Sequence, residues 1–364
     1  MRVMKRILFI IIVWLFGFDV MFSQDSLRHK VWEVDKINVQ FNFGFISPHH
    51  KYMNYLFSGH VKSLEVELMR KLNGYKYWHR LYKYPEMGVG YYFADLGNYK
   101  YLGFAHALYG KFVMPVRHSK TVFYNLSAGV AYLTECFDPQ ANYYNKIIGS
   151  HLNFYFRTGI SWQTRISPSM LMAIDLNLAH YSNGNFTEPN AGYNVISLGT
   201  AFMPILREPA VYDNGTMPEI KKHNFEILGA FGYKSAPENV YYPYPAYTLS
   251  VNYIRRFDYR NAVNVGADFF YDTSIYYHLL LSGREFKKEY NYSGGVHIGY
   301  EPFWGNTSIS IQSGVYLYNK ANLYGIFYHR AAIKHRIKNF VISLAIKSHF
   351  FSADILEWKV GYSF

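Results

Sequence analysis

Residues 151–163, HLNFYFRTGISWQ, alternate between bulky apolar and polar side chains at almost every step. One face carries Leu152, Phe154, Phe156, Ile160 and Trp162, and the other carries Asn153, Arg157, Ser161 and Gln163. Such alternation is typical of a β-strand with one buried and one exposed face. A large apolar face opposite a face with charge and amides predicts a transmembrane β-barrel, with lipid outside and a polar lumen. Arg157, and Asp175 of the following strand, are therefore expected in the lumen.

The same alternation continues along the chain and predicts an all-β, antiparallel outer-membrane barrel of about 16 strands. The strands are expected near 36–47, 60–71, 85–95, 100–116, 119–134, 149–164, 168–183, 193–206, 222–234, 245–257, 260–273, 289–301, 305–319, 324–336, 338–351 and 354–364. Aromatic residues make up 20% of the chain, which suits the aromatic girdles of such barrels. A soluble tyrosine-rich β-sandwich would also alternate, but its turns need not differ systematically in length, as most of these do.

The strands form two sets of eight that align with one another. For example, TVFYNLSAGVAYL in the first set matches TSISIQSGVYLYN in the second. We interpret this as a duplicated eight-strand unit, with residues 30–206 and 222–364 as the copies and 207–221 as a periplasmic connector. One barrel with the last strand paired to the first is favoured, because it leaves no edge inside the bilayer. The connector is long for a periplasmic turn, so two eight-stranded barrels are the alternative.

Residues 1–23 have the layout of a secretory signal peptide. A basic segment precedes the apolar stretch from Ile7 to Phe18, and the small residue Ser23 offers a cleavage point. A membrane-anchoring helix would need roughly 18 to 20 apolar residues. At the other end, the terminal Phe364 resembles the signal that outer-membrane barrels present to the barrel assembly machinery. These features predict a multi-pass barrel in the bacterial outer membrane.

Charge and cysteine content exclude several other classes of protein. The chain has a formal net charge of +12 and one cysteine, Cys136, so an internal disulfide is excluded. The positive charge is scattered, which argues against a nucleic-acid partner. Basic loop residues, Lys51, Lys146, Lys287 and Lys288, suit a phosphorylated glycolipid. Because the chain has no Gly-rich phosphate loop and no His/Cys metal spacing, we expect neither a cofactor nor a metal.

The stretch LNLAHYSNGNFTEPNAGYN, residues 176–194, places polar residues on a face that should meet lipid. His180 and Ser182 share the parity of the leucines before them, and Asn194 takes the same face of the next strand. Polar side chains are costly there, although less so near the interface. The cluster is expected on the outer surface at the extracellular rim, where it suggests a site. The alternative is that strand ends simply become polar at the lipid headgroups.

These residue types can build a serine esterase without a metal. A serine hydroxyl needs a base to accept its proton, and a histidine two residues away on one face lies about 6–7 Å along the strand. The imidazole needs a third group to fix its tautomer, usually a carboxylate and sometimes an amide. Asn194 could supply that amide, and Asn183 could donate to the developing oxyanion.

The same residues resemble a known family. The run His180-Tyr181-Ser182-Asn183, followed by Pro189-Asn190 and Gly192, is similar to the lipid A 3-O-deacylases of the PagL type. The resemblance covers roughly residues 36–206. It implies an eight-stranded outer-membrane barrel that cleaves an ester-linked acyl chain from lipid A, using a Ser-His-Glu triad that faces the membrane.

Carried over residue by residue, the resemblance assigns a role to each candidate. Ser182 becomes the nucleophile, His180 the general base and Asn183 a contributor to the oxyanion hole. The family's glutamate falls on Asn194, a departure, because an amide can orient the imidazole but cannot stabilise its cation as a carboxylate does. Glu188, in the same loop, is the second candidate for the acid. The expected activity is that of a carboxylic ester hydrolase acting on lipid A in lipopolysaccharide.

The second repeat lacks this equipment. Its counterpart, SHFFSAD, keeps His349 but has Ser352 three residues later, hence on the opposite face. We expect this half to be catalytically degenerate, either structural or a lipid-binding surface, with His349 an ordinary interface histidine. For the whole chain, the alternative function is a non-enzymatic porin-like or structural outer-membrane barrel with a decayed deacylase motif.

Overall fold

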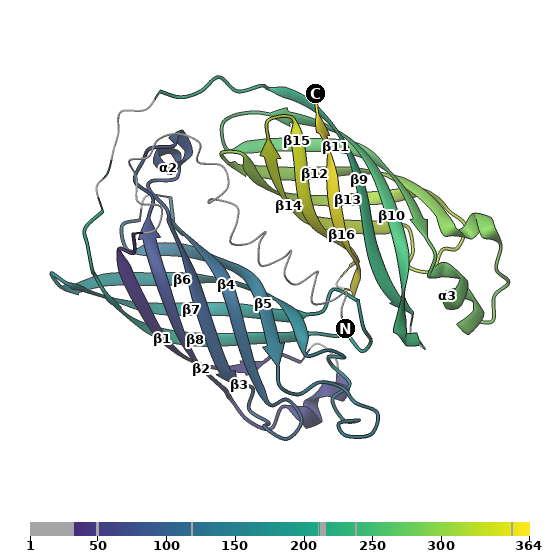
Figure 1. The fold of residues 1–364 in the computed structure, drawn as a ribbon, viewed down its shortest axis with the longest axis horizontal. Coiled ribbons are helices and arrows are strands. Elements are labelled where there is room, and N and C mark those ends of the chain that lie inside the picture. Colours follow the sequence, from purple (N-terminus) through teal and green to yellow (C-terminus); the bar gives the residue numbers. More distant parts are fainter. Residues whose placement is uncertain are drawn as a thin grey trace. The chain divides into compact units, whose positions relative to one another are not determined.

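The computed structural model describes residues 33–48, 51–117, 119–209, 211, 216–236, 239–350 and 352–364, so the predicted signal peptide lies outside the described residues. Within these ranges the chain forms two closed antiparallel barrels of eight strands each (Figure 1). The prediction of sixteen strands in two sets of eight is confirmed.

The first barrel follows chain order around its circumference. Its strands are β1 (Lys36–Ile46), β2 (Val61–Lys71), β3 (Glu86–Asp95), β4 (Phe104–Pro115), β5 (Val122–Leu133), β6 (Leu152–Ser167), β7 (Met170–Ser182) and β8 (Tyr193–Pro204). The β1–β2 connection contains the 3₁₀ helix η1 (Lys51–Leu56), and the long β2–β3 connection contains the helix α2 (Tyr77–Leu81). The loops after β1, β3, β5 and β7 all lie at one end of the barrel, here called the site end.

The second barrel repeats this order. Its strands are β9 (His223–Ala236), β10 (Asn239–Arg256), β11 (Asn261–Asp272), β12 (Tyr292–Trp304), β13 (Thr307–Asn319), β14 (Phe327–Ile337), β15 (Phe340–His349) and β16 (Ser352–Ser363). Between β11 and β12 lie the short helices α3 (Ile275–Leu281) and η2 (Lys288–Asn291). No helix in the described ranges has the length and apolar character needed to cross a membrane.

The favoured single barrel is wrong, and the alternative of two barrels is what the chain forms. β1 pairs with β8, for instance Phe43 with Leu198, and β16 pairs with β9, for instance Trp358 with Phe231. Each unit therefore removes its own edges without help from the other. Eight strands enclose an interior just wide enough for side chains to fill, so one copy of the repeat already makes a complete barrel.

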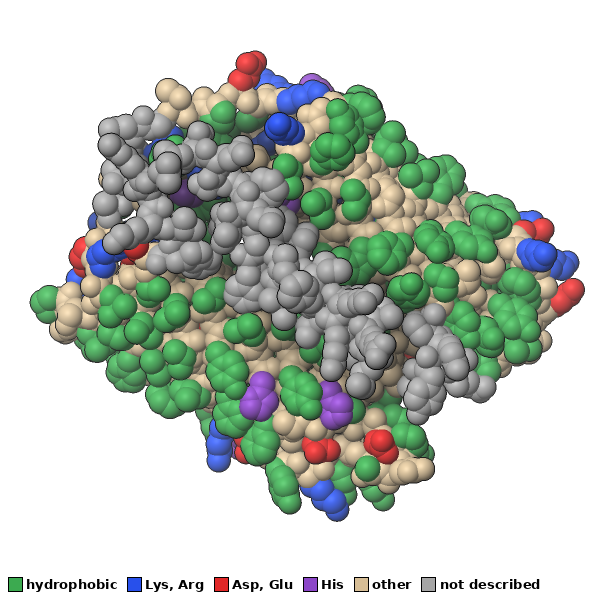
Figure 2. Space-filling view, in the orientation of Figure 1, with side chains coloured by type: hydrophobic (Ala, Val, Ile, Leu, Met, Phe, Trp, Pro, Cys, Tyr) green, Lys and Arg blue, Asp and Glu red, His purple; other side chains and the backbone are tan. Residues whose placement is uncertain are grey.

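The outer faces of both barrels are apolar, as the alternation predicts. On β1 the outward Phe41 is 57% exposed, and on β8 the outward Leu198 is 60% exposed. The face in view in Figure 2 carries hydrophobic side chains over the strands and most of its charged side chains toward the strand ends and loops. Between the outward positions, the inward ones are polar and buried. Apolar outward side chains and polar inward ones are the arrangement typical of barrels that are surrounded by lipid.

The lumen of the first barrel is filled by paired charges. Arg157 is 2% exposed and forms a salt bridge with the buried Glu65. Lys111 Nζ lies 2.8 Å from the carboxylate of Glu67, and the Tyr109 hydroxyl lies between the two glutamates, 2.5 Å from a Glu65 oxygen and 2.7 Å from a Glu67 oxygen. The predicted lumenal positions of Arg157 and Asp175 are confirmed, because both are buried on the inward face.

Replacing Arg157 by methionine should strongly destabilise the first barrel. The change leaves Glu65 buried without its cation, and breaking a buried pair in this way costs about 3–5 kcal/mol. Arg165→Met is the matched control on the same strand, because Arg165 and Glu208 form an exposed pair at 2.8 Å, worth about 0–1 kcal/mol. Urea unfolding in detergent micelles measures both. Equal losses for the two variants would contradict a charge-packed lumen.

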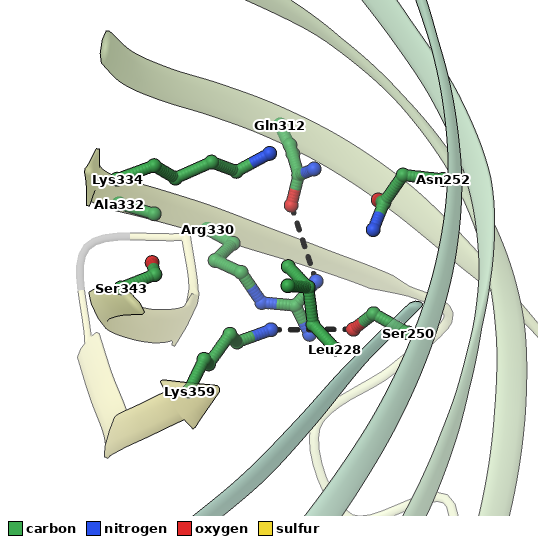
Figure 3. Close-up of a pocket in the computed structure, with 9 residues that line it drawn as sticks. All are labelled: Leu228, Ser250, Asn252, Gln312, Arg330, Ala332, Lys334, Ser343 and Lys359. Carbon is green, nitrogen blue, oxygen red and sulfur yellow. Dashed lines mark hydrogen bonds between the residues drawn. The ribbon is translucent and has the colours of Figure 1, made fainter. Parts of the chain in front are cut away.

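The lumen of the second barrel is also packed with side chains. Arg330 bonds the Asp268 carboxylate at 3.1 Å, the Glu357 carboxylate at 2.8 Å and the side-chain oxygen of Gln312 at 3.1 Å. Figure 3 shows this arginine beside Gln312, with Lys359 reaching Ser250 at 3.2 Å. The cavity that they line is about 10 Å³, roughly the room of one water molecule.

Candidate active site

The predicted site residues gather at the site end of the first barrel, where β7 ends and β8 begins. In the β7–β8 ladder, His180 is the cross-strand partner of Asn194. Ser182 is the last residue of β7 and shares the parity of His180. Leu178 and Leu176, which have the same parity, are 44% and 56% exposed, so this is the outward face. Ser182 itself is only 7% exposed.

The histidine and the asparagine form a hydrogen-bonded pair. His180 Nδ1 lies 2.7 Å from Asn194 Oδ1. Since an amide oxygen can only accept, Nδ1 carries the proton and Nε2 is the basic nitrogen of the neutral ring. This is the tautomer that a general base beside a serine requires. A carboxylate at position 194 would select the same tautomer, and the amide does so without a negative charge.

Gly192 leaves room for the edge of the His180 imidazole, because it has no Cβ. Its φ is +77°, a conformation in which residues with a Cβ are strained. A Cβ built there would stand 3.0 Å from His180 Cε1, 3.5 Å from His180 Nε2 and 2.8 Å from the carbonyl oxygen of Tyr181. The sequence presents Gly192 only as one letter of a motif, and the structure assigns it a steric role beside the basic nitrogen.

The loop after Ser182 is organised by Asn183. The backbone N–H of Asn183 donates to Asn190 Oδ1 at 2.9 Å, and its side-chain Nδ2 donates to the carbonyl oxygen of Thr187 at 2.7 Å. The first bond occupies the backbone donor that follows the nucleophile candidate. An oxyanion role for Asn183 therefore depends on the second hydrogen of its Nδ2 group, because each amide nitrogen carries two.

Glu188 is bound within this loop and not to the histidine pair. Its carboxylate accepts the backbone N–H of Asn190 at 3.2 Å. Burial raises the pKa of the Glu188 carboxyl above its ordinary value, and the bond from Asn190 opposes that rise. The acceptor beside His180 Nδ1 is the side-chain oxygen of Asn194.

His349 of the second barrel does not occupy the place of His180. It is 8% exposed and lies on the inward face of β15, on the same face as the buried Lys347. Its Nε2 is 3.0 Å from the hydroxyl of Tyr316, and its ring stacks on Tyr324 with centroids 4.5 Å apart. The interpretation of His349 as an interface histidine is wrong, because one position of shift between the repeats turns the side chain into the lumen.

The described residues contain no group of three or more histidine, cysteine, aspartate or glutamate side chains placed to hold a metal ion. What they do contain is a hydroxyl, an imidazole and an amide at one strand end. That set can deprotonate a serine and transfer an acyl group.

Each of the two barrels matches a known protein family. Residues 63–202 match the family profile described as lipid A 3-O-deacylase (PagL), and residues 223–364 match that of the acyloxyacyl hydrolase C-terminal domain. No curated protein matches the chain. Among solved structures, the outer membrane enzyme PagL is 18% identical, with 45% of this chain and 97% of that chain covered and a TM-score of 0.29.

Two further solved structures are similar at lower identity. CdiB from Escherichia coli is 9% identical, with 90% of this chain and 63% of that chain covered and a TM-score of 0.22. Omp33 of Acinetobacter baumannii is 8% identical, with 91% of this chain and 98% of that chain covered and a TM-score of 0.17.

Proposed function

From a chain whose first barrel belongs to the lipid A 3-O-deacylase (PagL) family and whose second matches the acyloxyacyl hydrolase C-terminal domain, we propose an outer-membrane serine esterase. It removes an ester-linked acyl chain from lipid A and so remodels lipopolysaccharide. The observation that carries this proposal is the hydrogen bond between His180 and Asn194 on the outward face, two residues from Ser182. The second barrel takes no part in the chemistry.

The proposed reaction proceeds through an acyl-enzyme. The Ser182 Oγ attacks the ester carbonyl carbon while its proton passes to His180 Nε2. The tetrahedral intermediate collapses, the ester C–O bond breaks, and the imidazolium returns the proton to the departing sugar oxygen. Water then attacks the acyl-serine with the same base, releasing a fatty acid and restoring the serine. Asn183 Nδ2 donates to the oxyanion in both halves.

The surroundings of the site support a substrate that lies in a membrane. The outward faces of β7 and β8 are apolar up to His180 and Asn194, with Thr200 as the exception. A lipid embedded beside the barrel can therefore bring an ester to the strand end without leaving the bilayer. We place the barrels in the outer membrane, delivered by the signal peptide in residues 1–23 and inserted by the barrel assembly machinery.

A porin-like function receives no support from the lumens. The cavity beside Asp175 in the first barrel and the cavity beside Arg330 in the second are each about 10 Å³. Side chains joined by ion pairs line both interiors, and ions or sugars would need a continuous water-filled path.

Mass spectrometry of lipid A tests the proposal directly. Cells that express the wild-type protein should show lipid A lighter by one acyl chain. Cells that express Ser182→Ala at the same level in the outer membrane should show the unmodified mass. If wild-type expression leaves the mass of lipid A unchanged, the esterase is excluded and a structural barrel remains.

Gly192→Ala should lower the rate of acyl release about tenfold or more while the barrel still assembles. The new methyl group would meet the imidazole edge and the Tyr181 carbonyl, at a backbone conformation that alanine rarely adopts. A displacement of about 1 Å at a reacting group can cost 10²-fold. Gly283→Ala is the control, because Gly283 also has a positive φ but has nothing within 4 Å of its built Cβ. If Gly192→Ala and Gly283→Ala are both as active as the wild type, Gly192 has no steric role at the site.

Glu188→Gln should leave acyl release nearly unchanged at neutral pH, since Glu188 bonds within the loop. Its raised pKa means that the folded loop is stabilised while the carboxyl is protonated, and that this stabilisation is lost as the pH rises through the folded-state pKa. The glutamine variant should lose that dependence. A rate loss as large as that of Asn194→Ala would instead assign the orienting acid to Glu188.

A further inference from the structure

Exposed tyrosines gather on the loops at the site end of the first barrel. Tyr144 lies at the centre of this group, with ring centroids 6.5 Å from Tyr55, 5.4 Å from Tyr101 and 6.3 Å from Tyr143. Tyr55, Tyr143 and Tyr144 are each more than half exposed. These four residues are called the tyrosine platform. They come from three different connections, which bring aromatic faces together on one surface.

The platform stands on a packed base. Fully or almost fully buried residues of the same loops include Met53, Leu56, Leu96, Leu102, Ile147 and Ile148. Hydrogen bonds join the loops above this base: Asn142 and Asn145 each donate to the carbonyl oxygen of Tyr101, at 3.0 and 2.9 Å. The hydroxyl of Tyr55 donates to the carbonyl oxygen of Tyr144 at 2.6 Å. The tyrosine rings are thus held by ordered backbone, and binding would cost little conformational entropy.

Two lysines give the platform a positive charge. Lys146 Nζ is 4.3 Å from the ring centroid of Tyr143 and 3.0 Å from its hydroxyl. Lys100 Nζ is 5.0 Å from the ring centroid of Tyr101. The carboxylate of Asp138, in the same loop, accepts the backbone N–H groups of Gln140 and Ala141. It is therefore turned into its own loop and leaves the ammonium groups on the surface.

The platform is joined to the site through the strand that carries Asn194. Asn145 Oδ1 accepts the hydroxyl proton of Tyr193 at 3.1 Å, and the backbone N–H of Gly192 donates to the carbonyl oxygen of Ile147 at 3.3 Å. Both contacts fall within two residues of Asn194. A headgroup on the platform would accordingly lie beside the strand end to which the acyl ester must come.

We propose that the tyrosine platform binds the phosphorylated saccharide headgroup of the glycolipid whose ester reaches Ser182, an inference that rests on the proposed function. Tyrosine rings present flat apolar faces to the C–H side of a sugar, and their hydroxyls bond its oxygens. Lys146 and Lys100 supply point charges for phosphate. A sugar ring with an adjacent phosphate fits this combination better than a phosphoethanolamine or phosphoglycerol headgroup, which has no ring to cover the aromatic surface.

Binding of a soluble headgroup tests the platform separately from catalysis. The probe is the phosphorylated glucosamine disaccharide left when lipid A is fully deacylated with alkali, titrated into full-length Ser182→Ala protein in phospholipid nanodiscs. Platform variants are Lys146→Met and the double change Tyr143→Ala with Tyr144→Ala. The controls are Tyr318→Ala and Lys320→Met in the second barrel. There the Lys320 Nζ lies 5.8 Å from the ring centroid of the exposed Tyr318. Inorganic phosphate and the unphosphorylated disaccharide are titrated in parallel.

Each platform variant should weaken disaccharide binding at least fivefold, while the controls should leave it unchanged. Unphosphorylated disaccharide and inorganic phosphate should both bind more weakly than the complete probe. The platform is excluded if its variants and the controls bind alike, if the parent protein does not bind the probe, or if inorganic phosphate binds as tightly as the probe. Lys146→Met changes only one exposed side chain, so this variant still tests the platform if the double tyrosine variant does not fold. Headgroup binding without any acyl release from lipid A would refute the esterase and leave the platform standing.

Discussion

Acyl release from lipid A should fall by about 10⁴-fold or more when Ser182 is replaced by alanine, and His180→Ala should have an effect of similar size. The residues of a catalytic unit are strongly non-additive, because loss of either the nucleophile or its base stops the same step. The double variant should consequently be no slower than either single one. The measurement is fatty-acid release by purified protein from lipid A in mixed micelles.

Folding of these variants must be established in the same preparation. Both positions lie at the strand end of β7, outside the charge-packed lumen, so neither change should alter the urea midpoint by much. Arg165→Met is a useful activity control, since it alters an exposed residue at the opposite end of the adjacent strand β6. Full activity of folded Ser182→Ala would refute the nucleophile assignment.

Asn194→Asp should raise the rate of acyl release at least tenfold, with a ceiling of about 10⁴-fold. In a serine protease, the reverse change from aspartate to asparagine lowers the turnover number by about 10⁴, and aspartate has the shape of asparagine. The 2.7 Å bond from His180 Nδ1 to Asn194 Oδ1 shows that a side chain of this length already reaches the ring. Glutamate, one methylene longer, would have to displace the ring or bend away, so Asn194→Glu should gain less than Asn194→Asp.

The pH profile separates a charge effect from a packing effect. A carboxylate stabilises the imidazolium, so the acidic limb of the rate profile, which follows deprotonation of His180, should move to higher pH in Asn194→Asp. Asn194→Ala should lower the rate substantially at every pH, because the ring loses its orienting partner. Asn194→Asp made together with Ser182→Ala should remain inactive. An aspartate variant no faster than wild type, with an unshifted profile, would show that position 194 does not act through the histidine.

The amino-acid sequence determined which residues form strands and which side chains face outward. Alternation is a local property with a period of two, so Arg157 and Asp175 could be placed in the lumen before any strand partner was known. The same parity placed His180, Ser182 and Asn194 on one face. Their juxtaposition needed only that two consecutive strands pair, as strands adjacent in the sequence usually do.

Tertiary structure alone decided how the strands close and how the loops fold. A single barrel and two barrels both satisfy every strand edge, so the local pattern could not choose between β1–β16 and β1–β8 pairing. The positive φ of Gly192 and the bonding of Asn183 to Asn190 arise from loop geometry, which no periodic pattern encodes. The contacts of His349 with Tyr316 and Tyr324 likewise join segments that only the closed second barrel brings together, although the local alternation already places His349 on the face of Lys347.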